Sequence, residues 1–188
     1  MPAAETTQIP LGFEAPDFTL PDVRSGQNVG LKELRGDKAT VVMFICNHCP
    51  YVKHVLPALV EFGRDYLGKG VQCIAISSND VVHYPEDAPD KMRGLAQSMD
   101  FPFPYLFDET QEVARAYQAV CTPDFSIFDH ELRCVYRGRM DGSRPGNDVV
   151  SDAADLRHAV DCMLAGKPVS DAQVPSLGCS IKWKQVRV

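Results

Sequence analysis

The sequence predicts an α/β domain with a central mixed sheet, helices on both faces and a small β-hairpin extension at the N-terminal end. Two continuous apolar runs, 40–45 and 71–76, are typical of buried parallel strands. Between them, apolar residues are spaced for one face of a helix that ends at Gly68 and Gly70. A strand, a helical crossover and a parallel strand form a right-handed unit almost without exception. The order of elements therefore favours a sheet covered on both faces.

The other elements follow from the same patterns. Segments 18–20 and 29–31 flank a Ser25-Gly26 turn and predict the N-terminal hairpin. After the second strand we expect a helix at 90–99, a strand at 105–107, a helix at 109–117, a hairpin of 125–128 with 132–136, and a helix at 152–164. A chain of 188 residues is long enough for one sizeable core and short for two. We expect residues 1–188 to form one domain, with 167–188 as a C-terminal tail.

Composition excludes several functions. The net charge is −6, which argues against a nucleic-acid partner. No apolar run approaches the roughly 18 residues of a membrane helix, and the first ten residues lack the basic flank and apolar stretch of a signal peptide. We therefore expect a cytoplasmic protein with no membrane partner. The seven cysteines cannot all pair within one chain, and a reducing compartment keeps thiols free.

The strand at 40–45 leads into a pair of cysteines at the start of the following helix. Pro50 suits the first helical position, which makes Cys49 the N-cap or its neighbour. A helix N-terminus carries roughly half a positive charge, and this stabilises the nucleophilic thiolate. A protonated His48 would lower the pKa of Cys49 further, and Cys46 supplies a second sulfur three residues upstream.

A CxxC pair can also occur without redox chemistry, in two ways. It could bind zinc, which needs four ligands, but the sequence holds no second CxxC and no HxxxH. The two cysteines could also be inert buried thiols. A CxxC between a strand and a helix favours redox chemistry over both. We expect no metal and no organic cofactor, since a phosphate-binding glycine loop is absent as well.

Several segments now carry a family resemblance: 12–22 (GFEAPDFTLPD), 107–109 followed by 113–117, and Thr122-Pro123. With these motifs the chain resembles the thioredoxin superfamily, and in particular the redoxins grouped with alkyl hydroperoxide reductase and thiol-specific antioxidant proteins. It is most similar to a peroxiredoxin-like branch with CNHCP and a GCSIKW-type tail, here 178–183. The resemblance extends to about Leu164. It implies a thioredoxin-like fold in which Pro123 is the cis-proline, next to backbone that would pair with an extended peptide substrate.

The resemblance also indicates which sulfur attacks. In thioredoxins a helix proline follows the attacking cysteine by eight positions, and Pro57 lies eight residues after Cys49 but eleven after Cys46. The second cysteine of thioredoxins then falls on Val52. Peroxiredoxins place Thr or Ser three residues before the peroxidatic cysteine, where this chain has Cys46. Cys49 is thus the expected nucleophile, with Cys46 as an unusual upstream thiol.

The remaining cysteines divide into two groups. Cys121 precedes Pro123 by two residues and could resolve a disulfide with Cys49 or merely line the groove. Cys179 could swing to Cys49 from a mobile tail, or be a surface thiol beside Trp183, which we expect to dock the tail. The others lie inside strand or helix patterns and are most simply core residues: Cys73, Cys134 and Cys162. The polar run 77–80 ends the second parallel strand, where it could line a site or simply start a turn.

These observations support a thiol–disulfide oxidoreductase as the main hypothesis. Cys49 attacks a protein or small-molecule disulfide, and Cys46, Cys121 or Cys179 resolves the mixed disulfide before a thiol reductant regenerates the protein. Peroxide reduction through a Cys49 sulfenic acid is the second hypothesis. The third is a non-enzymatic thiol- or metal-binding module that uses Cys46, Cys49 and Cys121.

Overall fold

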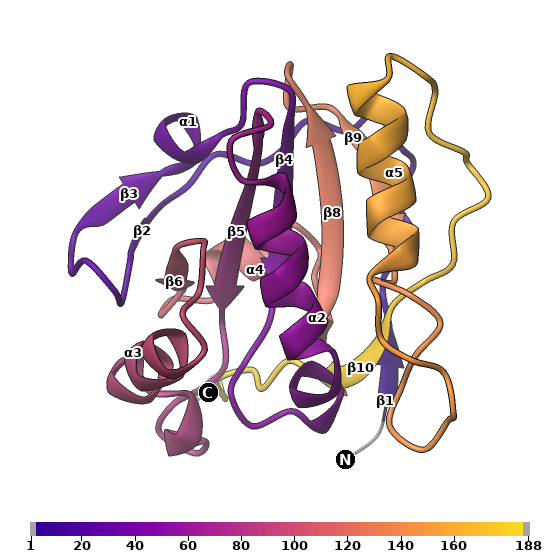
Figure 1. Ribbon diagram of the computed structural model, residues 1–188. Helices are drawn as coiled ribbons and strands as arrows, with labels where there is room; N and C mark the ends of the chain where they lie inside the picture. The colour runs from indigo at the N-terminus through magenta and orange to yellow at the C-terminus, as the bar shows by residue number, and fades with distance from the viewer. Residues whose placement is uncertain (1–2, 186–188) are drawn as a thin grey trace.

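The computed structural model describes residues 3–185, and its centre is the mixed sheet that the sequence predicts (Figure 1). The strand order is β6-β5-β4-β8-β9. The bounds are β4 Ala39–Phe44, β5 Val71–Ser77, β6 Tyr105–Phe107, β8 Asp124–Asp129 and β9 Cys134–Gly138. Strand β5 pairs in parallel with both β4 and β6. Strand β8 pairs antiparallel with both β4 and β9. The predicted fold class is confirmed.

Helices cover both faces of this sheet. Successive side chains of a strand point to opposite faces, so the apolar strands build one core on each face. In β4, Val41 and Met43 join one core and Val42 and Phe44 join the other. The first core is closed by α2 (Pro50–Tyr66), α3 (Pro89–Ser98) and α5 (Ala154–Leu164), of which α2 and α5 lie in front of the sheet in Figure 1. The second core is closed by α4 (Glu112–Ala116), α1 (Leu31–Leu34) and the N-terminal segment. No helix among residues 3–185 is long and apolar enough to cross a membrane.

The predicted N-terminal hairpin is confirmed as β2 (Thr19–Pro21) paired with β3 (Asn28–Gly30). The helix predicted at 109–117 is shorter than expected and begins only at Glu112. Gln111 before it adopts a left-handed backbone conformation with φ of 65°. The carboxylate of Asp108 accepts the N–H of Ala114 at 2.9 Å, so a side chain and not a longer helix satisfies this donor.

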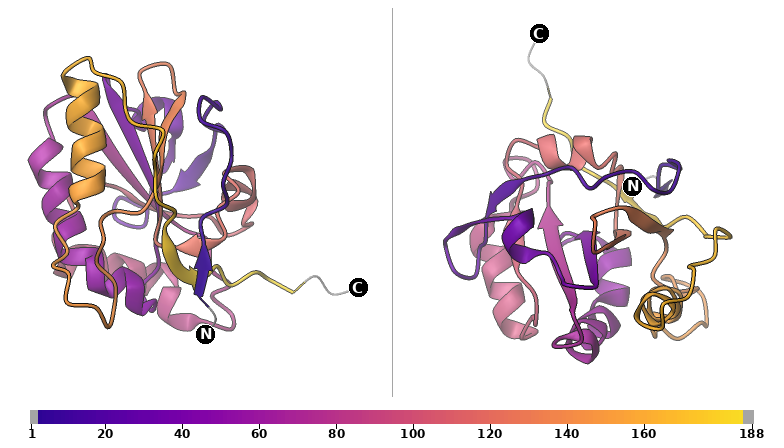
Figure 2. Two further views of the ribbon diagram at one scale, coloured as in Figure 1. Left: turned by 90° about the vertical axis from the view of Figure 1, so that its right-hand side faces the viewer. Right: turned by 90° about the horizontal axis from the view of Figure 1, so that it is seen from above.

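A second sheet, which no sequence pattern predicted, joins the two ends of the chain. It has the order β1-β10-β7, with β1 Ala3–Glu5, β7 Cys121–Thr122 and β10 Leu177–Ser180, and both pairings are antiparallel. Strand β10 belongs to the tail 167–188, of which 186–188 lie outside the described residues. Figure 2 shows β1 and β10 side by side, and Figure 1 shows β10 passing beside the start of α2.

Candidate active site

Cys49 lies where the loop after β4, helix α2 and strand β7 meet. It is the N-cap of α2, Pro50 follows at the first helical position, and its side chain is fully buried. In the thiol form Sγ donates to the carbonyl oxygen of Thr122 at 3.2 Å. The peptide bond between Thr122 and Pro123 is cis, as the resemblance implied. The helix start and the cis-proline loop therefore face each other across this sulfur.

The structure places Cys46 directly beside Cys49. Its Sγ lies 3.4 Å from the hydroxyl of Thr122. A hydrogen bond from Cys46 lowers the pKa of Cys49 to about 4, opposed by burial and reinforced by hydrogen bonds from Cys179 and the backbone of Val52. The same bond raises the pKa of Cys46 well above its ordinary value, together with burial. At neutral pH the pair therefore holds one thiolate, on Cys49, and one thiol donor, on Cys46.

A buried carboxylate, Asp87, organises the loop between these two cysteines. Its Oδ1 accepts the backbone N–H of Asn47 at 2.7 Å and that of His48 at 3.1 Å. Its Oδ2 lies 2.5 Å from Nδ1 of His48 and accepts the side-chain amide of Asn79 at 2.8 Å. Nδ1 of His48 is also 4.0 Å from Sγ of Cys46. His48 is thus held against Cys46 and Asp87, and its effect on the pKa of Cys49 stays a prediction.

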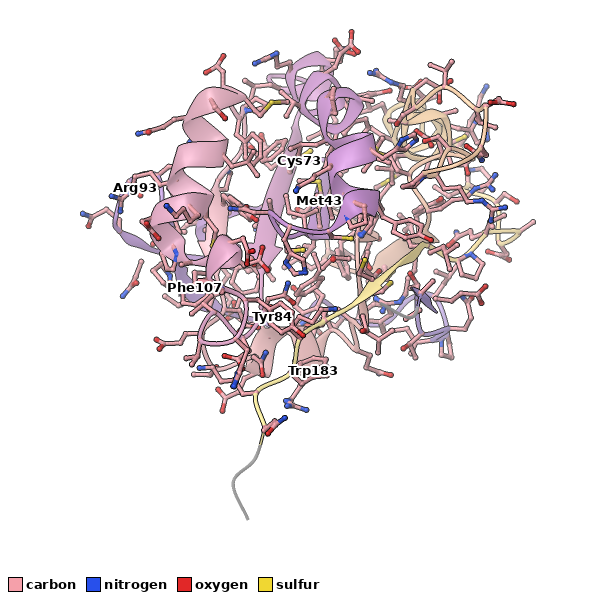
Figure 3. All side chains as sticks on the ribbon, turned by 90° about the horizontal axis from the view of Figure 1, so that it is seen from below. Met43, Cys73, Tyr84, Arg93, Phe107 and Trp183 are labelled. Atoms are coloured by element: carbon pink, nitrogen blue, oxygen red, sulfur yellow. The ribbon has the colours of Figure 1, made fainter. Side chains whose placement is uncertain are left out.

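Sequence reasoning missed Asp87, which lies in a 3₁₀-helix at Pro85–Asp87 far along the chain from Cys49. One signal was present, because the polar run 77–80 ends a parallel strand on the same edge of the sheet as the cysteines. Asn79 of that run does reach the site, through Asp87. The ring of His48 also stacks on Tyr84, with centroids 5.4 Å apart. Figure 3 shows Tyr84 beside the C-terminal segment that continues to Trp183.

Of the two candidate resolving thiols, the structure brings Cys179 to Cys49 and turns Cys121 away. Cys179 lies in β10 directly opposite Thr122 and is buried. Burial and the neighbouring Cys49 raise the pKa of Cys179 to about 11. Sγ of Cys121 points to the carbonyl oxygen of Pro123 at 3.8 Å, and burial raises its pKa as well.

The three other cysteines lie away from this site. Cys73 and Cys134 are buried, and burial raises the pKa of each to about 12. Cys162 departs from the expected core position because its place on α5 leaves it half-buried, with Sγ 3.8 Å from Nε2 of His158. It is the cysteine that an added thiol reagent reaches most easily among the described ones.

A cavity of about 180 Å³ opens next to Pro123. Its wall includes Tyr51 and Val55 from the start of α2, together with Arg139 and Arg144. No cysteine among the described residues lines it, so the cavity borders the thiol site without exposing it.

Three side chains of the site could serve as metal ligands. The donor atoms of Cys46, His48 and Asp87 lie within 4.8 Å of one another. Zinc takes four such ligands, and Cys49 is the nearest further thiolate. A zinc ion held here would complete its coordination with water or with the Cys49 thiolate, and the second arrangement would withdraw that sulfur from nucleophilic attack.

The low pKa of Cys49 leads to a first prediction. In the reduced protein the ultraviolet absorbance of the thiolate should fall as the pH drops through about 4, whereas an ordinary thiol loses it at about 8.5. Cys46→Ala should raise this midpoint because it removes the largest stabilising hydrogen bond, and Cys46→Ser should raise it less because a hydroxyl still donates. The Cys49→Ser variant should lack the step. A wild-type midpoint above neutral pH would contradict this account of the pair.

A strand, a helix-start cysteine and a facing cis-proline define a thioredoxin-fold thiol protein. The same fold occurs in a solved structure of a thiol:disulfide interchange protein from Chlorobium tepidum, with a TM-score of 0.66, 21% identity, and coverage of 84% of this chain and 99% of that one. Within this class the chain belongs to the AhpC/TSA family, whose model matches residues 11–143.

Relatives are named for each of the two reactions, peroxide reduction and thiol–disulfide exchange. A "putative peroxiredoxin" of Mycobacterium tuberculosis is 30% identical over 115 residues, which cover 61% of this chain and 68% of the relative. The thiol-disulfide oxidoreductase ResA of Geobacillus kaustophilus is 26% identical over 138 residues, 72% of this chain and 74% of the relative. A crystal structure of an "uncharacterized conserved protein" from Geobacillus kaustophilus is 54% identical, with a TM-score of 0.97 over 100% of this chain and 99% of that one.

Proposed function

We propose that this protein is a thiol–disulfide oxidoreductase in which Cys49 is the nucleophile. The observation that carries the proposal is the placement of Cys49 at the N-cap of α2, facing Thr122 and the cis-proline Pro123. The neighbouring Cys46 supports it by lowering the pKa of Cys49 to about 4. The thiolate is the species that attacks a disulfide, so the lowered pKa holds Cys49 in its nucleophilic form at neutral pH. The name of the ResA relative supports the same reaction class.

In the proposed reaction the Cys49 thiolate attacks one sulfur of a disulfide, and the other sulfur leaves as a thiolate. A second thiol of this chain then attacks Cys49 and releases the bound half of the substrate. Electrons return from an external thiol, which reduces the internal disulfide. Protein or small-molecule disulfides and a thiol reductant are therefore the partners, and a cytoplasmic location remains a prediction.

Peroxide reduction is the second candidate, supported by the AhpC/TSA family match and by the name of the Mycobacterium tuberculosis relative. This chain departs from the peroxiredoxin pattern, because Cys46 stands where peroxiredoxins have a Thr or Ser hydroxyl, so the Cys46 thiol would have to act as the donor to Cys49. Attack on a peroxide would leave Cys49 as a sulfenic acid and release an alcohol or water. The family membership is compatible with either oxidant.

Steady-state assays with a thiol donor distinguish the two reactions. The purified protein should turn over an aromatic or protein disulfide with a higher kcat/KM than hydrogen peroxide or an alkyl peroxide. The reverse order would replace the oxidoreductase proposal with the peroxidase, and a failure to consume either substrate would contradict both.

Metal analysis tests the non-enzymatic alternative. Freshly purified protein should contain zinc and copper well below one ion per chain, because the proposed function needs Cys49 free as a nucleophile. Added Zn²⁺ should inhibit turnover reversibly by binding the ligand set around Cys46 and Asp87. Stoichiometric metal that survives dialysis, with no turnover before or after chelation, would favour a metal-binding module.

A further inference from the structure

The exposed edge of a strand can bind another extended chain by main-chain hydrogen bonds. Strand β7 presents such an edge just before Pro123, beside the sulfur of Cys49. In this protein the edge is already paired, because β10 of the tail lies antiparallel along it with Cys179 opposite Thr122 and Ser180 opposite Cys121. The tail therefore occupies the place that an extended peptide substrate would take.

The register decides which tail side chain faces the site. Residues directly opposite each other in an antiparallel pair project to the same face. The side chain of Thr122 points to the thiols, with its hydroxyl 3.4 Å from Sγ of Cys46, and Cys179 opposite it points the same way. Cys121 is the adjacent residue of β7, so its side chain projects to the other face, and its Sγ lies 3.8 Å from the carbonyl oxygen of Pro123. Cys179 is therefore positioned like the reactive cysteine of a bound peptide.

The tail also covers the nucleophile. Cys49 has no exposed surface, and β10 packs against the start of α2 where Cys49 lies. Gly178 permits this close approach, because a Cβ at that position would lie 2.0 Å from the carbonyl oxygen of Thr122. Any residue other than glycine would push β10 away from β7.

Contacts beyond Cys179 hold the tail in this place. The side-chain oxygen of Asn79 accepts the N–H of Lys182 at 2.8 Å, and that of Gln111 accepts the N–H of Lys184 at 2.8 Å. The guanidinium of Arg115 lies over the ring of Trp183, 4.4 Å from its centroid, which confirms the predicted docking of the tail by this tryptophan.

From these contacts, and resting on the proposed function, we propose that β10 is a built-in substrate strand: it occupies the peptide-binding edge of β7 and supplies Cys179 as the resolving thiol of Cys49. After the Cys49 thiolate has attacked a disulfide RS–SR and released RS⁻, Cys179 loses its proton to solvent and attacks the sulfur of Cys49. The Cys49–SR bond breaks, a second RS⁻ leaves, and the Cys49–Cys179 disulfide forms. Two electrons have passed from the two cysteines to RS–SR.

The timing of this step follows from charge. While Cys49 is a thiolate, its negative charge adds to burial in keeping Cys179 protonated. Once Cys49 is part of a mixed disulfide that charge is gone, and ionisation of Cys179 becomes easier.

An aromatic disulfide reagent that releases a coloured thiolate tests the proposal, with all variants made in a Cys162→Ser background to remove the half-buried thiol. The parent protein should release two thiolates per chain in quick succession, and peptide mass spectrometry should find a Cys49–Cys179 link. Cys179→Ser should release only one and retain the reagent on Cys49. A second release from Cys179→Ser, or a Cys46–Cys49 link in the parent, would overturn the assignment of Cys179.

The same assay separates this inference from the proposed function. Cys49→Ser should show no fast release at all. Release from Cys49→Ser at the parent rate would contradict the role of Cys49 itself, whereas a stable mixed disulfide in the parent would contradict only the role of Cys179.

A second variant tests the covering role without altering any cysteine. Gly178→Val should displace β10, so the first release should be about tenfold faster and the second about tenfold slower, because local opening no longer limits access and Cys179 is no longer held in place. Gly94→Ala in α3 is the control, since its Cβ would meet nothing within 4 Å. Parent-like rates for both steps in a folded Gly178→Val protein would contradict the built-in strand. If that variant does not fold, the Cys179→Ser result decides the question.

Discussion

Cys49→Ser is expected to lower kcat/KM for disulfide reduction by at least about 10³-fold, because an alcohol does not ionise near neutral pH and cannot form a disulfide. The substitution is nearly isosteric, and serine is a good N-cap residue, so helix α2 should keep its start. The effect should therefore appear in activity and not in folding. Steady-state kinetics with an excess of reductant and a thermal melt of the same sample measure both.

Cys162→Ser is the matched control for this variant. It makes the same chemical change on the half-buried face of α5, away from the thiol pair, and should leave kcat/KM unchanged. Cys46→Ser should retain part of the activity, because a hydroxyl can still donate to the Cys49 thiolate. Equal residual activity in the Cys49 and Cys46 serine variants would show that the nucleophile has been misassigned.

Asp87→Ala is expected to lower the free energy of unfolding by about 3–5 kcal/mol, the usual cost of leaving buried partners of a charged group without it. Asp87 is fully buried and accepts hydrogen bonds from the backbone of Asn47 and His48 and from the side chain of Asn79. Alanine leaves all of these donors, and the ring of His48, without an acceptor. For a chain of this size the loss corresponds to a melting temperature lower by roughly 10 °C.

Urea denaturation of the reduced protein measures this effect, with Glu86→Ala as the control. Glu86 precedes Asp87 in the same 3₁₀-helix, but its side chain is exposed, so its removal should change stability by less than about 0.5 kcal/mol. Asp87→Asn should fall between the two because an amide oxygen still accepts. Equal stability of the Asp87→Ala and Glu86→Ala variants would mean that Asp87 does not organise the cysteine loop.

The choice of Cys49 as the proposed nucleophile rests on local features of the sequence. Pro50 indicates the start of a helix, and the partial positive charge of a helix start favours a thiolate there. The spacing from Cys49 to Pro57 then selects between the two cysteines. The strands around 40–45 and 71–76 were equally predictable, since their runs of apolar residues are longer than any competing local signal.

Two other elements could not be predicted in full from the sequence, the start of α4 and strand β10. The helix expected at 109–117 lost its first turn because Asp108 binds an amide that a longer helix would have used. Strand β10 contains Gly178 and a cysteine and has no alternating apolar pattern, so nothing in the tail indicates pairing. It forms a strand because β7 on one side and β1 on the other satisfy its backbone.

The sequence by itself determined the fold class and placed Cys49, the proposed nucleophile, at a helix start, because both follow from patterns within one or two consecutive elements. Only the tertiary structure decided which other groups share the site. Asp87 reaches the loop before Cys49, and Cys179 reaches Cys49 itself, from 38 and 130 positions further along the chain. Cys121 is turned away by the alternation of a two-residue strand. Such contacts are set by strand register and loop packing, and no local pattern of residue types encodes them.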